Sequence, residues 1–108
     1  MNVAIVQGRV RGESDRRLLR DGTLLVSFDV VVSSSDGPDQ QVPVTWAGAE
    51  GRAPMVEEGM LVTVVGRVLR RFYRSGGQTS SRTDVRADRV VKGAGARAVA
   101  AIEAALRS

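Results

Sequence analysis

Five valine-rich runs separated by turn sequences are the feature that most limits what this chain can fold into. Valine dominates the apolar residues, and the aromatic residues are one Trp, one Tyr and two Phe. Stiff, β-branched side chains favour strands over helices. With 108 residues, the chain has the length of one domain and can bury a hydrophobic core. We therefore expect a single, mainly β domain.

The strands are predicted from alternating apolar residues and from the turns between them. Asp21-Gly22 and the double glycine Gly76-Gly77 are typical hairpin turns, and Gly66 indicates a bend. Pro43 indicates an edge or a bulge in the third strand. The charged segment 11–20 is predicted to be irregular, and residues 33–39 form a loop. The predicted strands are residues 2–10, 23–34, 40–46, 60–73 and 80–91.

Two helices complete the predicted fold. Pro54 can open a short helix that Gly59 closes with a left-handed cap. Residues 97–107 are alanine-rich, with Val99, Ile102 and Leu106 at helical spacing, which predicts an amphipathic helix whose apolar face covers another surface. Five strands with a helix between the third and the fourth follow the order of a five-stranded OB-fold, a Greek-key barrel, although another Greek-key barrel would give a similar pattern. We expect an all-β OB-fold domain at 1–93 and a C-terminal helical extension at 94–108.

The composition argues against an enzyme. The chain has no Cys and no His, which removes thiol nucleophiles, disulfides and the usual zinc ligands. Its acidic residues are scattered, and the run DGPD at 36–39 has too few ligands for calcium. We therefore expect no catalytic residues, no cofactor and no metal site. The first residues do not resemble a secretory signal, and no apolar run is long enough for a membrane span. We expect a cytoplasmic protein without membrane contact.

Positive charge is concentrated in one part of the sequence. Between Glu58 and Asp84 the chain contains no acidic residue, whereas the run RVLRRFYRSGG at 67–77 contains four arginines, Phe72 and Tyr73. The net charge is +4, and Lys92 is the only lysine. A GC-rich genome enriches Arg over Lys without any functional cause. Phosphate recognition by planar guanidinium groups is the other explanation, and the uneven distribution of the charge favours it.

Several segments resemble bacterial single-stranded DNA-binding proteins. They are VAIVQGRV at 3–10, DGTLLVSFDVVVSS at 21–34, VTW at 44–46, EEGMLVTVVGRVLRRFY at 57–73 and ADRVV at 87–91. The resemblance covers about residues 2–93 and depends on the order and spacing of these segments. It implies non-sequence-specific binding of single-stranded DNA in replication, repair or recombination, by a homotetramer or a homodimer.

The resemblance also implies site residues. Tyr73 and Trp46 fall on base-stacking aromatic positions, although a lone Trp at a strand end is equally typical of a core. Arg71 falls on a phosphate-contacting arginine. Their neighbours complete the predicted DNA-binding set, which is Trp46, Arg67, Arg70, Arg71, Phe72, Tyr73 and Arg74.

The chain departs from the family in three ways. Gln40 stands at another stacking position, the loop SSSDGPDQ is short and lacks an aromatic residue, and the chain stops at Ser108 without an acidic tail. It therefore resembles a shortened paralogue, and recruitment of proteins through such a tail is not expected. The alternative function is an OB-fold oligomeric interaction module, such as a primosomal or assembly factor, with weak or lost DNA binding.

The mechanism follows from what a single strand exposes, which is base faces and a flexible phosphate chain. The two-residue period of a strand places Arg67, Leu69, Arg71 and Tyr73 on one face, and this face is predicted to line the groove. Val68, Arg70, Phe72 and Arg74 lie on the other face, which is predicted to begin as core at Val68. On this hypothesis the arginines lack protein partners because phosphates are their partners. The alternative is a solvated hairpin whose Phe72 packs on the barrel.

Overall fold

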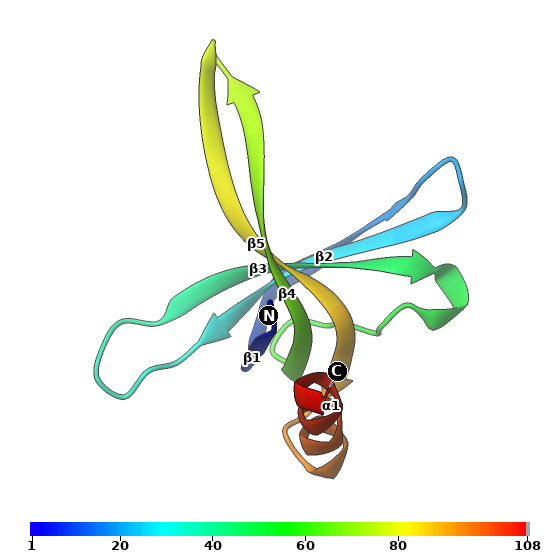
Figure 1. Ribbon diagram of the computed structural model, residues 1–108, viewed down its shortest axis with the longest axis vertical. Coiled ribbons are helices and arrows are strands. Elements are labelled where there is room, and N and C mark those ends of the chain that lie inside the picture. The colour runs from blue at the N-terminus through cyan, green and yellow to red at the C-terminus, as the bar shows by residue number, and fades with distance from the viewer. Residues whose placement is uncertain (108) are drawn as a thin grey trace.

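A computed structural model shows five strands closed into a barrel (Figure 1). It describes residues 1–107; Ser108, the last residue of the predicted extension, lies outside the described residues. The described strands pair in the order β1-β2-β3-β5-β4; β3 and β5 run parallel, and the other neighbours are antiparallel. This is the arrangement of an OB-fold, so the predicted fold class is confirmed. The strands are β1 (Ala4–Leu18), β2 (Thr23–Val32), β3 (Gln40–Ala49), β4 (Leu61–Ser75) and β5 (Gln78–Lys92).

The barrel interior is filled mainly by valine. In β2, buried and partly exposed residues alternate from Thr23 to Val30, as the two-residue period requires. Phe28 also lies in the core and is 5% exposed. A narrow five-stranded barrel leaves room for small branched side chains, which explains the scarcity of large aromatic residues. The side chains below 2% exposure include Val26, Val30, Val44, Val62 and Val64.

The first strand is longer than predicted. Residues 11–18, which we expected to be irregular, continue β1 and pair with β2 as far as Leu18 opposite Leu24. The pairing register shifts between Arg11 and Asp15, and Gly12 in this interval has a φ of 76°. A bulge with a glycine in the left-handed region lets the strand absorb extra residues and then resume pairing. The predicted turn at Asp21-Gly22 is present, with Gly22 at a φ of 90° and the carboxylate of Asp21 accepting the N–H of Thr23.

The hairpin of β4 and β5 extends beyond the barrel. β4 pairs with β1 through Leu61–Gly66, so within residues 1–107 its only neighbouring strand from Arg67 onward is β5. Residues 67–84 form this projecting hairpin, which we call the arm (Figure 1). Gly76 and Gly77, with φ of 59° and 81°, form its tip as predicted.

The arm leaves the barrel at Gly66. The register between β4 and β5 shifts between Val65 and Gly66, which confirms the predicted bend. A Cβ atom at Gly66 would lie 2.0 Å from the backbone oxygen of Arg86, so only glycine allows the strands to approach this closely. Just beyond, the side-chain amide of Asn2 donates to the carbonyl of Val68 and accepts its N–H, both at 2.9 Å. Asn2 therefore covers the first open position on the edge of β4.

The connection from β3 to β4 contains a shorter helix than predicted, and it lies earlier in the chain. A single 3-10 turn, η1 (Glu50–Arg52), precedes Pro54 instead of following it. The helix predicted from Pro54 to Gly59 is not formed, because the backbone there bonds to β1: the N–H of Gly59 donates to Val10 O, and the N–H of Val10 to Met60 O. Gly59, at a φ of 85°, lies in a turn rather than at a helix end.

The C-terminal helix α1 (Ala96–Arg107) packs on the outside of its own barrel. Its buried residues are Ala98 and Ala101, which contact Val65 of β4 and Val91 of β5. The predicted apolar face is therefore partly wrong: Ile102 joins the contact, but Val99 and Leu106 are 48% and 56% exposed. Alanine is small enough to let the helix lie close to the strands. No helix in residues 1–107 is long and apolar enough to span a membrane.

Candidate nucleic-acid interface

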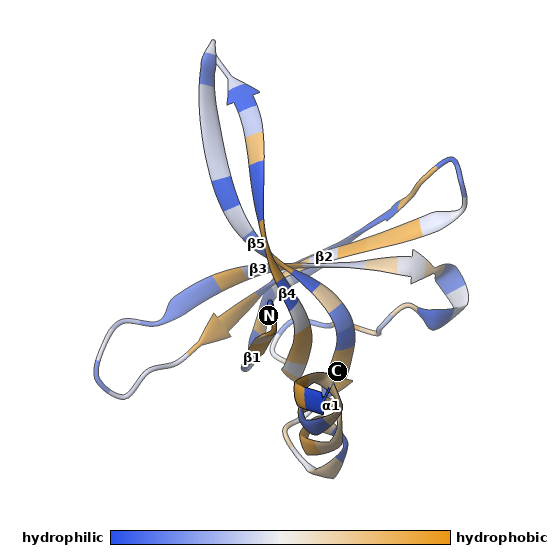
Figure 2. Ribbon diagram, in the orientation of Figure 1, coloured by the Kyte–Doolittle hydropathy of each residue, from blue (hydrophilic) through white to orange (hydrophobic). Residues whose placement is uncertain are grey.

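The arm carries the whole excess of positive charge. Residues 67–84 contain five arginines and one aspartate, a net charge of +4. The remainder of the chain, with eleven basic and eleven acidic residues, is neutral. Figure 2 shows apolar barrel strands giving way to hydrophilic positions along the arm. A polyanion is therefore attracted to the arm rather than to the barrel.

Each face of the arm presents its own set of side chains. Residues directly opposite each other in an antiparallel pair lie on the same face. The Tyr73 face carries the pairs Leu69–Asp84, Arg71–Arg82 and Tyr73–Ser80, with Arg67 at its base opposite Arg86 of the barrel. The Phe72 face carries Arg70–Thr83, Phe72–Ser81 and Arg74–Thr79, with Val68 at its base opposite Val85 of the barrel. The two predicted faces of β4 are confirmed.

Both aromatic rings of the arm are accessible. Phe72 is 69% exposed and Tyr73 is 51% exposed. Phe72 does not pack against the barrel, so that part of the alternative is wrong, and a solvated hairpin stays open as an interpretation. Val68 is also wrong as a core residue: it is 44% exposed, whereas Val85 opposite it is buried. Val68 lies where the barrel ends. The face of the arm that continues the barrel interior is therefore open to solvent from Val68 onward.

Three arm arginines are free of protein partners. Among residues 1–107, Arg67, Arg70 and Arg74 make no ion pair and no side-chain hydrogen bond, and all three are exposed. Arg67 lies on the Tyr73 face, and Arg70 and Arg74 lie on the Phe72 face. Their guanidinium groups retain all of their donors for an external anion.

Arg71 differs from these three and corrects our expectation that the arm arginines lack protein partners. Its Nε lies 3.3 Å from a carboxylate oxygen of Asp84, and the Nε of Arg82 lies 2.8 Å from the other oxygen. The hairpin register places Asp84 opposite Leu69 and therefore on the same face as both arginines. Arg82 and Asp84 were not among the predicted site residues.

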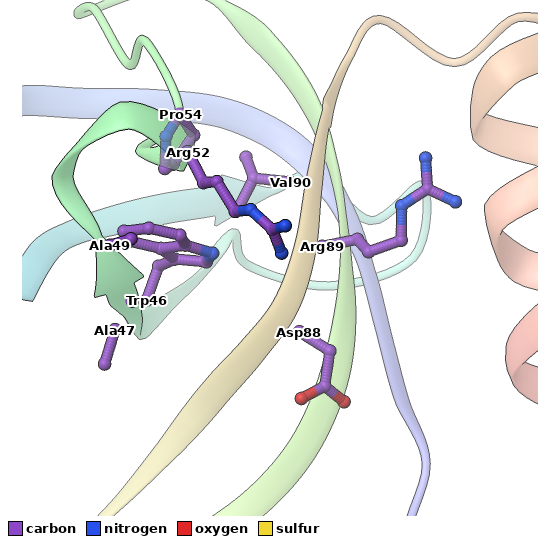
Figure 3. Close-up of a pocket in the computed structure, with 9 residues that line it drawn as sticks. Trp46, Ala47, Ala49, Arg52, Pro54, Asp88, Arg89 and Val90 are labelled. Atoms are coloured by element: carbon purple, nitrogen blue, oxygen red, sulfur yellow. The ribbon is translucent and has the colours of Figure 1, made fainter.

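Trp46 lies apart from the arm. It is 8% exposed and belongs to the barrel core, facing inward like Val44 two residues before it. Its ring lines a cavity of about 710 Å³ where β3 and β5 diverge, together with Arg52, Asp88 and Arg89 (Figure 3). The structure therefore brings together six of the seven predicted residues on the arm and places Trp46 in the barrel.

The outer face of β2 and β3 lacks stacking residues. Its outward positions include Leu25 and Ser27 on β2, opposite Ala47 and Thr45 on β3. OB-folds often bind oligonucleotides across the face of strands 2 and 3. Because Trp46 points inward, this surface offers no aromatic ring here.

A comparison with solved structures supports the fold. No family model and no curated protein matches the sequence. Among solved structures, the chain is similar to a Plasmodium falciparum SSB in complex with ssDNA, with a TM-score of 0.73 and 14% sequence identity. The match covers 85% of this chain and 94% of that chain. At this identity the likeness shows a shared OB-fold.

Proposed function

We propose that this protein binds single-stranded DNA without sequence specificity and that the arm is its main contact surface. The observation that carries the proposal is that two exposed aromatic rings lie on the same hairpin as the entire positive excess of the chain. Single-strand binders combine a basic surface that follows the backbone with rings on which bases stack. Every base has a flat face, so such binding tolerates any sequence.

Each of the six predicted residues on the arm has a defined role in this proposal. Arg67, Arg70 and Arg74 contact phosphates through forked guanidinium donors. Phe72 and Tyr73 stack on bases, each contact being worth about 1–3 kcal/mol. Arg71 binds phosphate beside Arg82. Trp46 is left out of this surface, because its ring lies in the barrel core.

The wider role follows from the two likenesses. The Plasmodium protein of the same fold is described in complex with ssDNA. The sequence segments resemble bacterial single-stranded DNA-binding proteins. We propose on this basis a non-catalytic role in replication, repair or recombination, with a homo-oligomer as the working unit.

Specific observations also favour the alternative, an oligomeric OB-fold module with weak DNA binding. The outer face of β2 and β3 has no aromatic residue, and Asp84 offsets part of the charge of Arg71. This alternative predicts that the exposed rings of the arm contact another protein chain instead of bases.

A fluorescence anisotropy titration separates the two functions. Labelled oligo-dT and a labelled duplex of equal length are titrated with the protein at low salt. We expect a strong preference for the single strand, because only unpaired bases can stack on Phe72 and Tyr73. Equal affinity for both ligands would contradict base stacking, and an absence of binding at low salt would support the interaction module.

A further inference from the structure

A buried carboxylate joins two arginines at the base of the arm. The side chain of Asp84 is 7% exposed, whereas those of Arg71 and Arg82 are 53% and 56% exposed. One oxygen of Asp84 faces each arginine, at 3.3 Å and 2.8 Å. Asp84 thus lies beneath a pair of guanidinium groups that remain open to solvent.

This bridge holds together two groups that otherwise repel each other. Arg71 and Arg82 are directly opposite in the β4–β5 pairing, and like charges at such positions destabilise a hairpin. Asp84 lies two residues from Arg82 on the same strand and diagonally across from Arg71, so its carboxylate reaches both. It neutralises one of the two charges and leaves the pair with a net charge of +1.

The bonding pattern leaves the phosphate-binding part of each arginine free. Both arginines meet Asp84 through Nε, and neither uses a terminal amino group in a hydrogen bond within residues 1–107. The two terminal nitrogens of a guanidinium form the fork that binds a phosphate through parallel N–H···O bonds. Two such forks, held side by side, suit the oxygens of one phosphodiester.

We propose that Asp84 is a positioning residue that holds Arg71 and Arg82 as a two-arginine clamp for one phosphate of the bound strand. This inference rests on the proposed function and adds Arg82 to the phosphate-binding residues. The clamp lies on the Tyr73 face, so the phosphate it binds belongs to the nucleotides next to the base stacked on Tyr73.

The surroundings place the phosphate on the arm and not against the barrel. Arg71 and Arg82 also line a cavity of about 310 Å³ whose β1 and β2 side carries Glu13, Asp15 and Asp29. These carboxylates repel an anion from the cavity and none of them pairs with the two arginines. The same layout supplies a control, because Asp15 is exposed, lines this cavity and, among residues 1–107, makes no ion pair with Arg71 or Arg82.

The test compares Asp84→Asn with Asp15→Asn in oligo-dT titrations over a range of salt concentrations. Each change removes one negative charge near the same arginines, so simple Coulomb attraction predicts tighter binding for both variants. The clamp predicts that the two substitutions change the affinity for oligo-dT in opposite directions. We expect Asp15→Asn to bind as well as or better than the wild type, and Asp84→Asn to bind roughly tenfold more weakly, as for the loss of one charge-assisted contact. The slope of log affinity against log salt concentration, which we call the salt slope, should fall in magnitude by about 0.7 for Asp84→Asn. This is the value for one phosphate contact on a single strand.

Asp84→Asn binding that is as tight as, or tighter than, that of the wild type would overturn the clamp while leaving single-strand binding intact. If the wild type itself does not bind oligo-dT, the proposed function fails instead. Should Asp84→Asn lose the wild-type circular dichroism spectrum, Arg82→Gln carries the test, because its side chain is exposed. We expect Arg82→Gln to reduce both affinity and salt slope as above, and an unchanged slope would refute the clamp.

Discussion

At the scale of single residues, the exposure of the two arm rings results from what lies opposite them. Phe72 faces Ser81 and Tyr73 faces Ser80 across the hairpin. A serine is too small to cover a ring, so neither aromatic side chain is packed against its cross-strand neighbour. Exposed aromatic residues on a projecting hairpin cost solvation free energy, which is recovered when a base or another flat surface covers them.

This arrangement makes the rings testable one at a time. We expect Tyr73→Ala and Phe72→Ala each to weaken binding to oligo-dT by about 1–3 kcal/mol, the usual worth of one stacked base. The measurement is an anisotropy titration at fixed salt. Met55→Ala serves as the control, because Met55 is apolar, 74% exposed and outside the arm. Affinities of both arm variants within error of the wild type would exclude stacking on these rings.

Two residues show what the sequence could and could not predict about the site. Trp46 lies two residues after Val44, and this spacing alone indicates the inward face. The Arg71–Asp84 contact was also accessible: pairing Ser75 with Gln78 around the Gly76-Gly77 tip places Leu69 opposite Asp84 and Arg71 two residues away. What the sequence does not contain is the burial of the Asp84 side chain, which depends on how the arm meets the barrel.

At the scale of elements, the predicted strands and helices were right where apolar residues follow a regular pattern. They were wrong where backbone hydrogen bonds determine the local structure. β2 was predicted closely because its burial follows a regular period. The bounds of α1 were also predicted closely, but its buried face is formed by alanines and not by Val99 and Leu106. The extension of β1 over charged residues was missed, because a bulge at Gly12 and not apolar patterning continues the strand. The helix at Pro54 was misplaced, because its backbone groups bond to β1.

The contact of α1 with the barrel yields a prediction about stability. Ala101 packs against β4 and β5 and is 1% exposed, whereas Ala100, the residue before it in the same helix, is exposed. We expect Ala101→Leu to destabilise the fold by about 1–3 kcal/mol, because extra methylene groups are forced into a filled contact. Ala100→Leu should leave the Tm almost unchanged, since leucine and alanine have similar helix propensities.

Thermal unfolding followed by circular dichroism compares the two variants. If Ala101→Leu and Ala100→Leu melt at the same temperature, α1 does not pack on this barrel through its alanine face.

At the scale of the whole molecule, charge separates the arm from the rest of the chain. The barrel and helix together are neutral, and the arm carries +4. Phosphate contacts release counterions, so binding to a single strand weakens with salt by a slope of about 0.7 per phosphate. The slope therefore gives the number of phosphate contacts. Comparing the slopes of the wild type and of arm variants shows whether the arm makes these contacts.

We expect the triple variant Arg67→Gln, Arg70→Gln and Arg74→Gln to lower this slope by about 2, from three lost phosphate contacts. The matched control removes three exposed arginines outside the arm: Arg20→Gln, Arg97→Gln and Arg107→Gln. Both variants have the same net charge, so a general charge effect changes them equally. Equal slopes for the two triple variants would place the phosphate contacts elsewhere than on these arm residues.

The most direct test of the arm as the binding surface is NMR mapping of backbone amide shifts during titration of the ¹⁵N-labelled protein with oligo-dT. We expect the largest shift changes within residues 67–84 and little change at Leu25 and Ala47, a pair on the outer face of β2 and β3 away from the cavity that Arg71 and Arg82 line. Large changes at this pair with an unchanged arm would contradict the arm as the binding surface.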